Sequence, residues 1–255
     1  MPATNPKFRI AICGGGIGGL ALAAVLARHE REDSPIEVNL YEGRPEITTF
    51  GAGITVWQRT WRVMQLLGID GQLAEASVRP PNKGIGPGFT YRRGDNDTNP
   101  FTYHTVMLPY GSSSMHRADL VGVLKSNIPS RYKIHVSKKL SKYIEIADTD
   151  GQIKHIELTF TDGTTAEADI LIGADGIKSA VRSTMYDLAH QHECSLDIGR
   201  DDCPRCSAAT PKWTGMIAYR YLIPTERLKK VNPNHQGLRS TLCVRRFTFE
   251  YLDCP

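Results

Sequence analysis

The chain has 255 residues, of which 40% are hydrophobic and 23% are charged, and this balance predicts a soluble globular protein with one large domain or two small ones. The formal net charge is only +4 at pH 7, and no block of Lys and Arg alternates with aromatic residues, which argues against a nucleic-acid-binding protein. No segment has the pattern of a cleavable signal or of a membrane span, so the expected location is cytoplasmic.

The N-terminal part of the chain predicts one β–α–β unit. Residues 7–13 end in an apolar run typical of a buried strand, and a glycine-rich loop follows at residues 14–19. Apolar residues at helical spacing from 17 to 25 predict a helix after the loop. Residues 36–41 predict a second strand, which ends at Glu42.

Further elements are expected along the rest of the chain. A small-residue loop at 51–55 precedes a helix over 56–67, with Gly68 as its C-cap. The remaining predicted elements, in chain order, are strand pieces at 89–92 and 103–108, a helix from 115 to about 127, a strand at 132–136, a hairpin of 140–146 and 153–160, a strand at 168–172, a helix over about 177–186, and a strand at 213–221.

The glycine loop and the acid after the second strand form a dinucleotide-binding pattern. Gly14 permits a tight turn, Gly16 lets the backbone approach a pyrophosphate, and Gly19 lets the helix pack closely on the strand. The N-terminus of the helix offers N–H groups and a positive dipole end to the phosphates. Glu42 can accept hydrogen bonds from ribose hydroxyls. The pattern fits NAD and FAD equally well.

A second motif favours FAD. Residues 170–182 predict a strand, an Asp175-Gly176 turn and a helix that carries Ser179 and Arg182. This segment resembles the "DG" motif of the group A flavin-dependent monooxygenases, which use FAD and NAD(P)H. Residues 42, 51–54 and 115–120 also resemble that family, with the greatest likeness to fungal salicylate-hydroxylase-like enzymes. The resemblance covers about residues 8–182 and resumes at 213–224.

The resemblance implies a role for each candidate site residue. Each functional role has a purely structural alternative. These alternatives are a structural ion pair at Asp175 and Arg182, a solvated Arg117, and ordinary outward polar residues at 213–221. The residues with an implied cofactor-binding role are Gly14, Gly16, Gly19 and Glu42 at the ADP part of FAD, Ala52 and Gly53 near the flavin, and Arg117 and Asp175. The residues with an implied catalytic role are Arg182, Tyr219 and Arg220, which could contact a phenol or a carboxylate of the substrate.

The family also implies an overall fold and activity. The expected fold is α/β, with a Rossmann-like FAD-binding domain of the glutathione-reductase type and an incomplete β-sheet substrate domain. The expected activity is NAD(P)H-dependent hydroxylation of a small aromatic substrate, such as a phenolic acid, with molecular oxygen. The expected domains are residues 1–78 with 112–189 for FAD, 79–111 with 213–236 on the substrate side, an insertion at 190–212 and an atypical tail at 237–255.

The chain departs from the family pattern after Arg182. No counterpart of the family's later Gly-Asp motif follows, and residues 237–255 resemble nothing expected there, which predicts a truncated or alternatively spliced end with little or no hydroxylase activity. Two alternatives therefore stay open: a non-catalytic FAD-binding fragment and an NAD-dependent Rossmann dehydrogenase.

Five of the six cysteines lie in the last quarter of the chain. Cys203 and Cys206 form a Cys-x-x-Cys pair within the predicted insertion, and Cys194, His190 and His192 precede it. Such a set could bind zinc. Because only one Cys-x-x-Cys pair is present, the favoured interpretation is a disordered polar loop with reduced thiols and no metal.

Overall fold

The computed structural model describes residues 6–47, 53–81, 83–93, 101–194, 197–217, 219, 223–238 and 241–245. The chain forms two compact units, Met1–Phe50 with Leu120–Ala218 and Gly51–Asp119 with Tyr219–Pro255. The boundary falls within helix α4 (Arg117–Ser126). Residues 51–78 thus group with the second unit and not with the glycine loop, whereas the functional division into domains stays a prediction.

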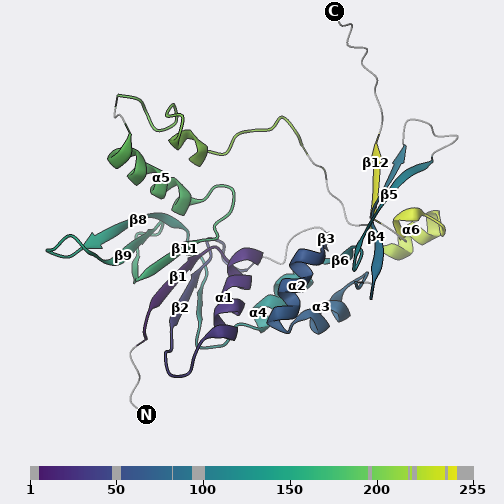
Figure 1. Ribbon diagram of the computed structural model, residues 1–255, viewed down its shortest axis with the longest axis horizontal. Helices are drawn as coiled ribbons and strands as arrows, with labels where there is room; N and C mark the ends of the chain where they lie inside the picture. Colours follow the sequence, from purple (N-terminus) through teal and green to yellow (C-terminus); the bar gives the residue numbers. More distant parts are fainter. Residues whose placement is uncertain are drawn as a thin grey trace, which may run out of the picture. The chain divides into compact units, whose positions relative to one another are not determined.

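The first unit contains a four-stranded parallel sheet with the order β11-β1-β2-β7. Figure 1 shows β11, β1 and β2 of this sheet side by side. The helix α1 (Ile17–His29) connects the first two strands. Because β1 lies between β2 and β11, the chain leaves β1 toward one side of the sheet and returns later on the other, and ligands bind at such switch points. The Rossmann-like α/β prediction is confirmed. The strands are β1 (Arg9–Cys13), β2 (Glu37–Tyr41), β7 (Lys133–His135) and β11 (Ile170–Gly173).

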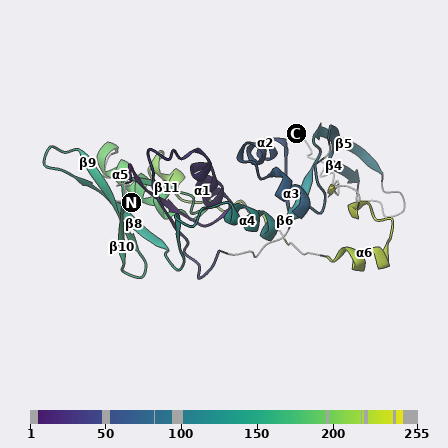
Figure 2. The ribbon, with the colours of Figure 1, turned by 90° about the horizontal axis from the view of Figure 1, so that it is seen from below.

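The parallel sheet is covered on both faces, and side chains of β1 alternate between them. A Cβ on Gly19 of α1 would lie 3.4 Å from the Ile12 side chain, so Ile12 faces the helix. Ala11 and Cys13 pack on the opposite face against Leu158. That face is covered by an antiparallel sheet of β8 (Leu140–Ala147), β9 (Ile153–Phe160) and β10 (Thr165–Ala168). Figure 2 shows this sheet and α1 on opposite sides of β11.

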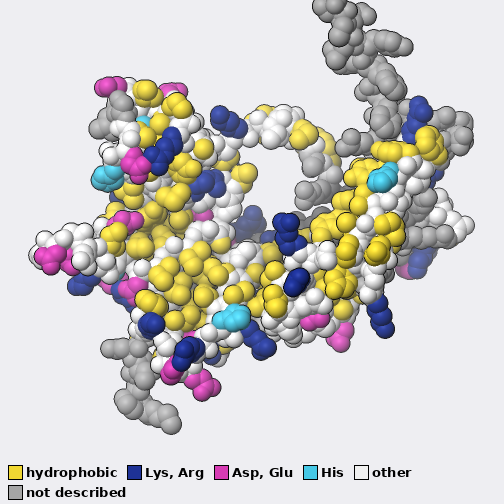
Figure 3. Space-filling view, viewed as in Figure 1, with side chains coloured by type: hydrophobic (Ala, Val, Ile, Leu, Met, Phe, Trp, Pro, Cys, Tyr) yellow, Lys and Arg dark blue, Asp and Glu magenta, His cyan; other side chains and the backbone are white. Residues whose placement is uncertain are grey.

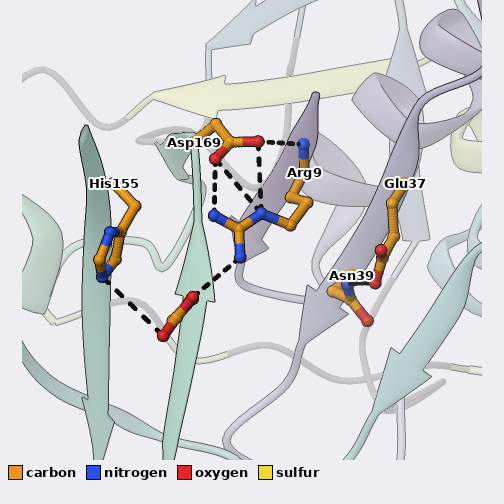
Figure 4. A network of polar contacts seen from close by, with 6 residues as sticks. Arg9, Glu37, Asn39, His155 and Asp169 are labelled. Carbon is orange, nitrogen blue, oxygen red and sulfur yellow. Dashed lines mark hydrogen bonds and ion pairs between the residues drawn. The ribbon is translucent and has the colours of Figure 1, made fainter. Parts of the chain in front are cut away.

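An ion-pair network holds the start of β1 to the strand that precedes β11 (Figure 4). Arg9 donates from its backbone N to Asp169 Oδ2 over 2.7 Å and from Nη2 to Asp169 Oδ1 over 2.7 Å. Arg9 Nη1 also pairs with Glu167 at 2.9 Å. The single strand predicted at 168–172 is therefore wrong: Asp169 turns toward Arg9 and separates β10, which pairs with β9, from β11, which pairs with β1.

The last helix of the first unit is longer than predicted. Helix α5 (Ala180–Glu193) continues about two turns past residue 186 and is followed by the 3-10 helix η1 (Cys206–Ala209). His190 and His192 belong to α5, so the predicted insertion begins inside a helix. Among the described residues, no helix combines the length and apolar character needed to cross a bilayer.

The second unit begins with a two-stranded antiparallel sheet. Strand β3 (Gly53–Val56) pairs with β6 (Ser113–His116), so the predicted loop at 53–55 and the predicted helix start at 115 are both wrong. The helix predicted over 56–67 is present as α2 (Gln58–Leu67), but it begins two residues later because Val56 belongs to β3. Gly68 ends the helix in the left-handed region at φ 72°, as predicted. Helix α3 (Asp70–Ala76) follows it.

A second sheet of this unit has the order β12-β4-β5. The strand predicted at 213–221 is wrong for its described residues, which are 213–217 of the first unit and 219 of the second. These residues form no strand, and Trp213 and Met216 are 74% and 76% exposed. Figure 3 shows hydrophobic side chains gathered over β4 and β5, where Phe89 and Met107 are exposed. The elements are β4 (Ile85–Arg93), β5 (Thr102–Pro109), β12 (Thr241–Arg245), α6 (Thr225–Val231) and the 3-10 helix η2 (Gln236–Leu238).

Candidate functional site

The three motif glycines at the end of β1 are needed for different reasons. Gly14 has φ 113°, and a Cβ there would lie 2.2 Å from the carbonyl oxygen of Ala174. A Cβ on Gly19 would lie 1.9 Å from the Gly14 oxygen. Both glycines are therefore required by the packing of the chain itself. A Cβ on Gly16 would meet nothing within 4 Å, so the space beside Gly16 is open to a ligand.

Helix α1 begins at this loop with an uncapped N-terminus. Its N-cap is Gly16, which offers no side-chain hydrogen bond, and its first turn contains no acidic residue. The first N–H groups of a helix have no intrahelical acceptor, and the helix dipole favours an anion there. The loop thus has the features of a phosphate-binding helix N-terminus.

Glu42 lies beside the glycine loop, as predicted. Its Oε2 accepts a hydrogen bond from Gly15 N over 2.8 Å, and its Oε1 accepts one from Arg44 N over 2.8 Å. The carboxylate is thereby held at the edge of the loop, where it can also accept from the hydroxyl groups of a ribose. Gly15, which is not one of the three glycines of the motif, is part of this arrangement, because a Cβ there would lie 2.9 Å from Glu42 Oε2. The run of three consecutive glycines at 14–16 is the sequence feature that points to a role for Gly15.

The loop after β11 meets the loop after β1. Ala174 N donates to Cys13 O over 2.7 Å, which ties the two loops together. Asp175 Oδ2 accepts from Ala180 N at 2.7 Å and from Val181 N at 3.1 Å, so the carboxylate caps α5. Its other oxygen, Oδ1, is buried and has no hydrogen-bond partner in the described structure. A buried carboxylate oxygen without a donor is a position that a hydroxyl group of a ligand would satisfy.

The N-termini of α1 and α5, which follow the two loops, differ in how well they suit a phosphate. Burial raises the pKa of the Cys13 thiol to about 12, and the Asp175 carboxylate adds to the shift, so this thiol beneath the loops stays neutral at physiological pH. Helix α5 begins with side-chain caps from Asp175 and from Ser179, whose Oγ accepts from Arg182 N over 2.9 Å. The uncapped α1 N-terminus is therefore the better phosphate site of the two helices.

Gly53 and Arg117 come together in the second unit. In the β3–β6 pair, Gly53 lies opposite His116, the residue that precedes Arg117 at the start of α4. The pairing thus brings a glycine with an exposed backbone next to a helix that begins with a cation. Ala52 lies outside the described residues. The cofactor roles of these residues stay predictions.

The three candidate catalytic residues are not assembled into a site by the described contacts. Arg182 donates from Nε to Ala209 O over 3.1 Å and contacts the carbonyl oxygens of Gly176 and Ile177, so its guanidinium holds backbone in the first unit. Tyr219 belongs to the second unit, and its side chain is 93% exposed. Arg220 lies outside the described residues. Their catalytic roles remain predictions.

The geometry at β1, β2 and β11 fits FAD. The open space at Gly16 and the uncapped N-terminus of α1 suit a pyrophosphate. Asp175 Oδ1 and the Glu42 carboxylate are acceptors that suit sugar hydroxyl groups. For residues of the second unit, a role in binding the flavin end of FAD is implied only by the family resemblance.

Comparisons with known proteins agree with this geometry. The model of a family described as "FAD binding domain" matches residues 7–198. The chain is 32% identical over 242 residues to the FAD-dependent monooxygenase str9 of Strobilurus tenacellus, which covers 93% of this chain and 50% of that protein. It is 32% identical over 230 residues to a salicylate hydroxylase of Pseudomonas putida, which covers 90% of this chain and 46% of that protein.

A solved structure supports the same assignment. The structure of a salicylate hydroxylase substrate complex superposes with a TM-score of 0.57 at 29% identity, over 73% of this chain and 40% of that one. The chain spans about half the length of the curated relatives it matches. Its cofactor is FAD, as the family match and the glycine-loop geometry both indicate. The chain is therefore a member of the FAD binding domain family, of the kind found in the group A FAD-dependent monooxygenases.

Proposed function

We propose that this chain supplies the FAD-binding part of a monooxygenase that uses NAD(P)H and molecular oxygen to hydroxylate a small aromatic substrate, such as a phenolic acid. The observation that carries the proposal is the open space at Gly16 next to an uncapped helix N-terminus, with Glu42 bonded to the same loop. The names of the similar proteins supply the substrate class.

The residues of the chain would bind and orient the cofactor, and bound FAD would supply the redox chemistry that transfers electrons from NAD(P)H to oxygen. The N–H groups at the start of α1 would hold the pyrophosphate. Glu42 would accept from the ribose, and Asp175 Oδ1 would accept from a further hydroxyl group of the cofactor. Gly53 and Arg117 would contact the flavin end from β3 and α4.

Residues of the second unit would contact the aromatic substrate. The predicted substrate-side residues 79–111 include β4 and β5, which carry a row of aromatic side chains. Phe89 lies 4.9 Å from the ring of Trp57, and Tyr91 lies 6.1 Å from the ring of Tyr103, centroid to centroid. Aromatic faces of this kind suit contact with an aromatic ring. Tyr219 and Arg220 would add polar contacts to the phenol and carboxylate of the substrate.

The test compares three readouts on the purified chain. Visible flavin bands, FAD identified after extraction, and hydroxylated product formed in step with NAD(P)H consumption in the presence of salicylate would support the monooxygenase. Bound FAD without product would favour the non-catalytic FAD-binding fragment. Extraction of NAD in place of FAD would contradict the proposal and favour the Rossmann dehydrogenase.

A further inference from the structure

A cluster of one histidine and three cysteines lies at the end of α5, away from the glycine loop in sequence. Its members are His190, Cys194, Cys203 and Cys206, here called the Cys3His cluster. The nitrogen and sulfur atoms that could bind a metal all lie within 4.8 Å of one another. His190, Cys203 and Cys206 are buried, with exposures of 7%, 6% and 0%. These residues are not a disordered polar loop in the structure.

The fold brings the cluster together from two segments. His190 and Cys194 are four residues apart at the end of α5 and therefore share one face of the helix. Cys203 and Cys206 flank the turn that leads into η1, where Ser207 N donates to Cys203 O over 3.0 Å. The Cys-x-x-Cys turn thus presents two sulfurs toward the helix face.

The sulfur separations match a tetrahedral metal centre and not a disulfide. Cys194 Sγ lies 3.7 Å from Cys206 Sγ and 3.9 Å from Cys203 Sγ. A disulfide would require an S–S distance of about 2.05 Å. Metal–sulfur bonds of about 2.3 Å in a tetrahedron place the sulfurs about 3.8 Å apart. The thiols already stand at that separation.

The histidine is oriented as a metal ligand. Its Nε2 lies 2.9 Å from the carbonyl oxygen of Ile198, and because a carbonyl only accepts, Nε2 carries the proton. Nδ1 is then the nitrogen with a free lone pair, and it is buried with no hydrogen-bond partner in the described structure. Metal-bound histidines typically donate their other N–H to a carbonyl in this way.

Polar contacts outside the cluster hold the two segments in place. Arg200 Nη1 donates to Ser183 Oγ over 2.7 Å and to Asp187 Oδ1 over 2.9 Å, which joins the second segment to α5. Arg205 pairs with Glu193 one residue before Cys194. These contacts lie outside the ligand atoms, so they position the cluster without occupying it.

We propose that this chain binds one Zn²⁺ ion as a structural site through four ligands: His190 Nδ1 and the sulfurs of Cys194, Cys203 and Cys206. Three thiols release their protons to solvent, and three thiolates and one neutral imidazole complete a tetrahedral shell. Three sulfurs and one nitrogen without a carboxylate favour zinc over Mg²⁺ or Ca²⁺. Because the protein fills all four positions, the ion would fasten residues 197–210 to α5 and would not take part in catalysis.

The first experiment measures metal content on the whole chain, purified without a polyhistidine tag from zinc-supplemented cells. Elemental analysis is expected to find one zinc per chain in the wild type and in the matched control Cys243→Ser, which changes a cysteine in β12. Cys203→Ser and Cys206→Ser are each expected to lower zinc content by about tenfold or more. Equal zinc content in the control and in both cluster variants would overturn the proposal.

A second measurement needs no variant to fold. X-ray absorption at the zinc edge of the wild-type chain should show three sulfurs at about 2.3 Å and one nitrogen at about 2.0 Å. A shell of oxygen and nitrogen alone, or a wild-type chain that holds no zinc after supplementation, would contradict the site.

Discussion

Gly15 donates its backbone N–H to Glu42 Oε2 over 2.8 Å, which joins the glycine loop after β1 to the residue that ends β2. The same carboxylate accepts from Arg44 N through its other oxygen. Glu42 therefore shapes the loop and presents an acceptor beside it, and these two effects make its substitution informative.

Glu42→Ala is expected to weaken FAD binding by about ten- to a hundredfold, because hydrogen bonds to a charged group contribute about 1.5 to 3 kcal/mol. Titration of the flavin-free chain with FAD measures the dissociation constant. Glu32→Ala, which changes an exposed acid in the same unit, is the control and should leave the constant unchanged. An unchanged constant in Glu42→Ala would remove this residue from the cofactor site.

Gly16→Val is expected to abolish FAD binding and to retain the fold. Its Cβ would enter space that no protein atom occupies within 4 Å, and the extended backbone at φ −76° accepts valine. Flavin content after purification measures binding, and circular dichroism measures the fold. Gly18→Ala, which also points into open space but lies outside the motif spacing, should keep its FAD.

Gly19→Ala should behave in the opposite way to Gly16→Val. The added carbon would lie 1.9 Å from the Gly14 oxygen, so the helix must shift away from the strand. We expect a loss of about 1 to 3 kcal/mol in the free energy of unfolding, measured in urea without FAD. Unchanged stability would mean that α1 can move at little cost.

Two substitutions of Asp175 can test the roles of its two carboxylate oxygens separately. Asp175→Ala should lower the free energy of unfolding by about 1 kcal/mol, because α5 loses an N-terminal cap. Asp175→Asn can keep one acceptor for α5 but replaces the other oxygen with an NH2 donor. It should therefore retain more stability than Asp175→Ala and still bind FAD more weakly than the wild type. Full FAD affinity in Asp175→Asn would show that Oδ1 does not accept from the cofactor.

Acid should weaken the first unit through Asp169. The hydrogen bonds from Arg9 hold the pKa of the Asp169 carboxyl below its usual value. A carboxyl with a lowered folded-state pKa stabilises the protein above its unfolded pKa of about 3.9, and this contribution is lost as the pH falls through the folded-state pKa. Asp169→Asn should cost about 1 kcal/mol at pH 7, since the pair is partly exposed.

The difference between the wild type and Asp169→Asn should therefore shrink when the urea midpoint is measured below pH 4. Asp150→Asn, at an exposed turn, is the control and should shift the midpoint little at either pH. A difference that stays constant from pH 7 to the acid range would show that the Arg9 pair does not couple stability to protonation.

The sequence by itself determined the cofactor unit. The apolar run before Gly14, the spacing of the three glycines and Glu42 at the end of the next strand are local patterns, and each has a local physical reason. The Asp175-Gly176 turn added the resemblance to the flavin family. The structure confirms this arrangement. It could be predicted from the sequence because a β–α–β unit forms from contacts between elements that are neighbours in the chain.

Tertiary structure decided what depends on partners distant in sequence. The strand expected at 168–172 splits because Asp169 turns to Arg9, which lies 160 residues away. Met115 lies in a strand because β3 pairs with β6. The sequence predicts thiols in a disordered loop at Cys203 and Cys206, because their spacing alone cannot show that α5 extends far enough to bring His190 beside them. Hydrophobic periodicity reports the local environment of a residue, whereas the choice of a distant partner is made by packing of the whole unit.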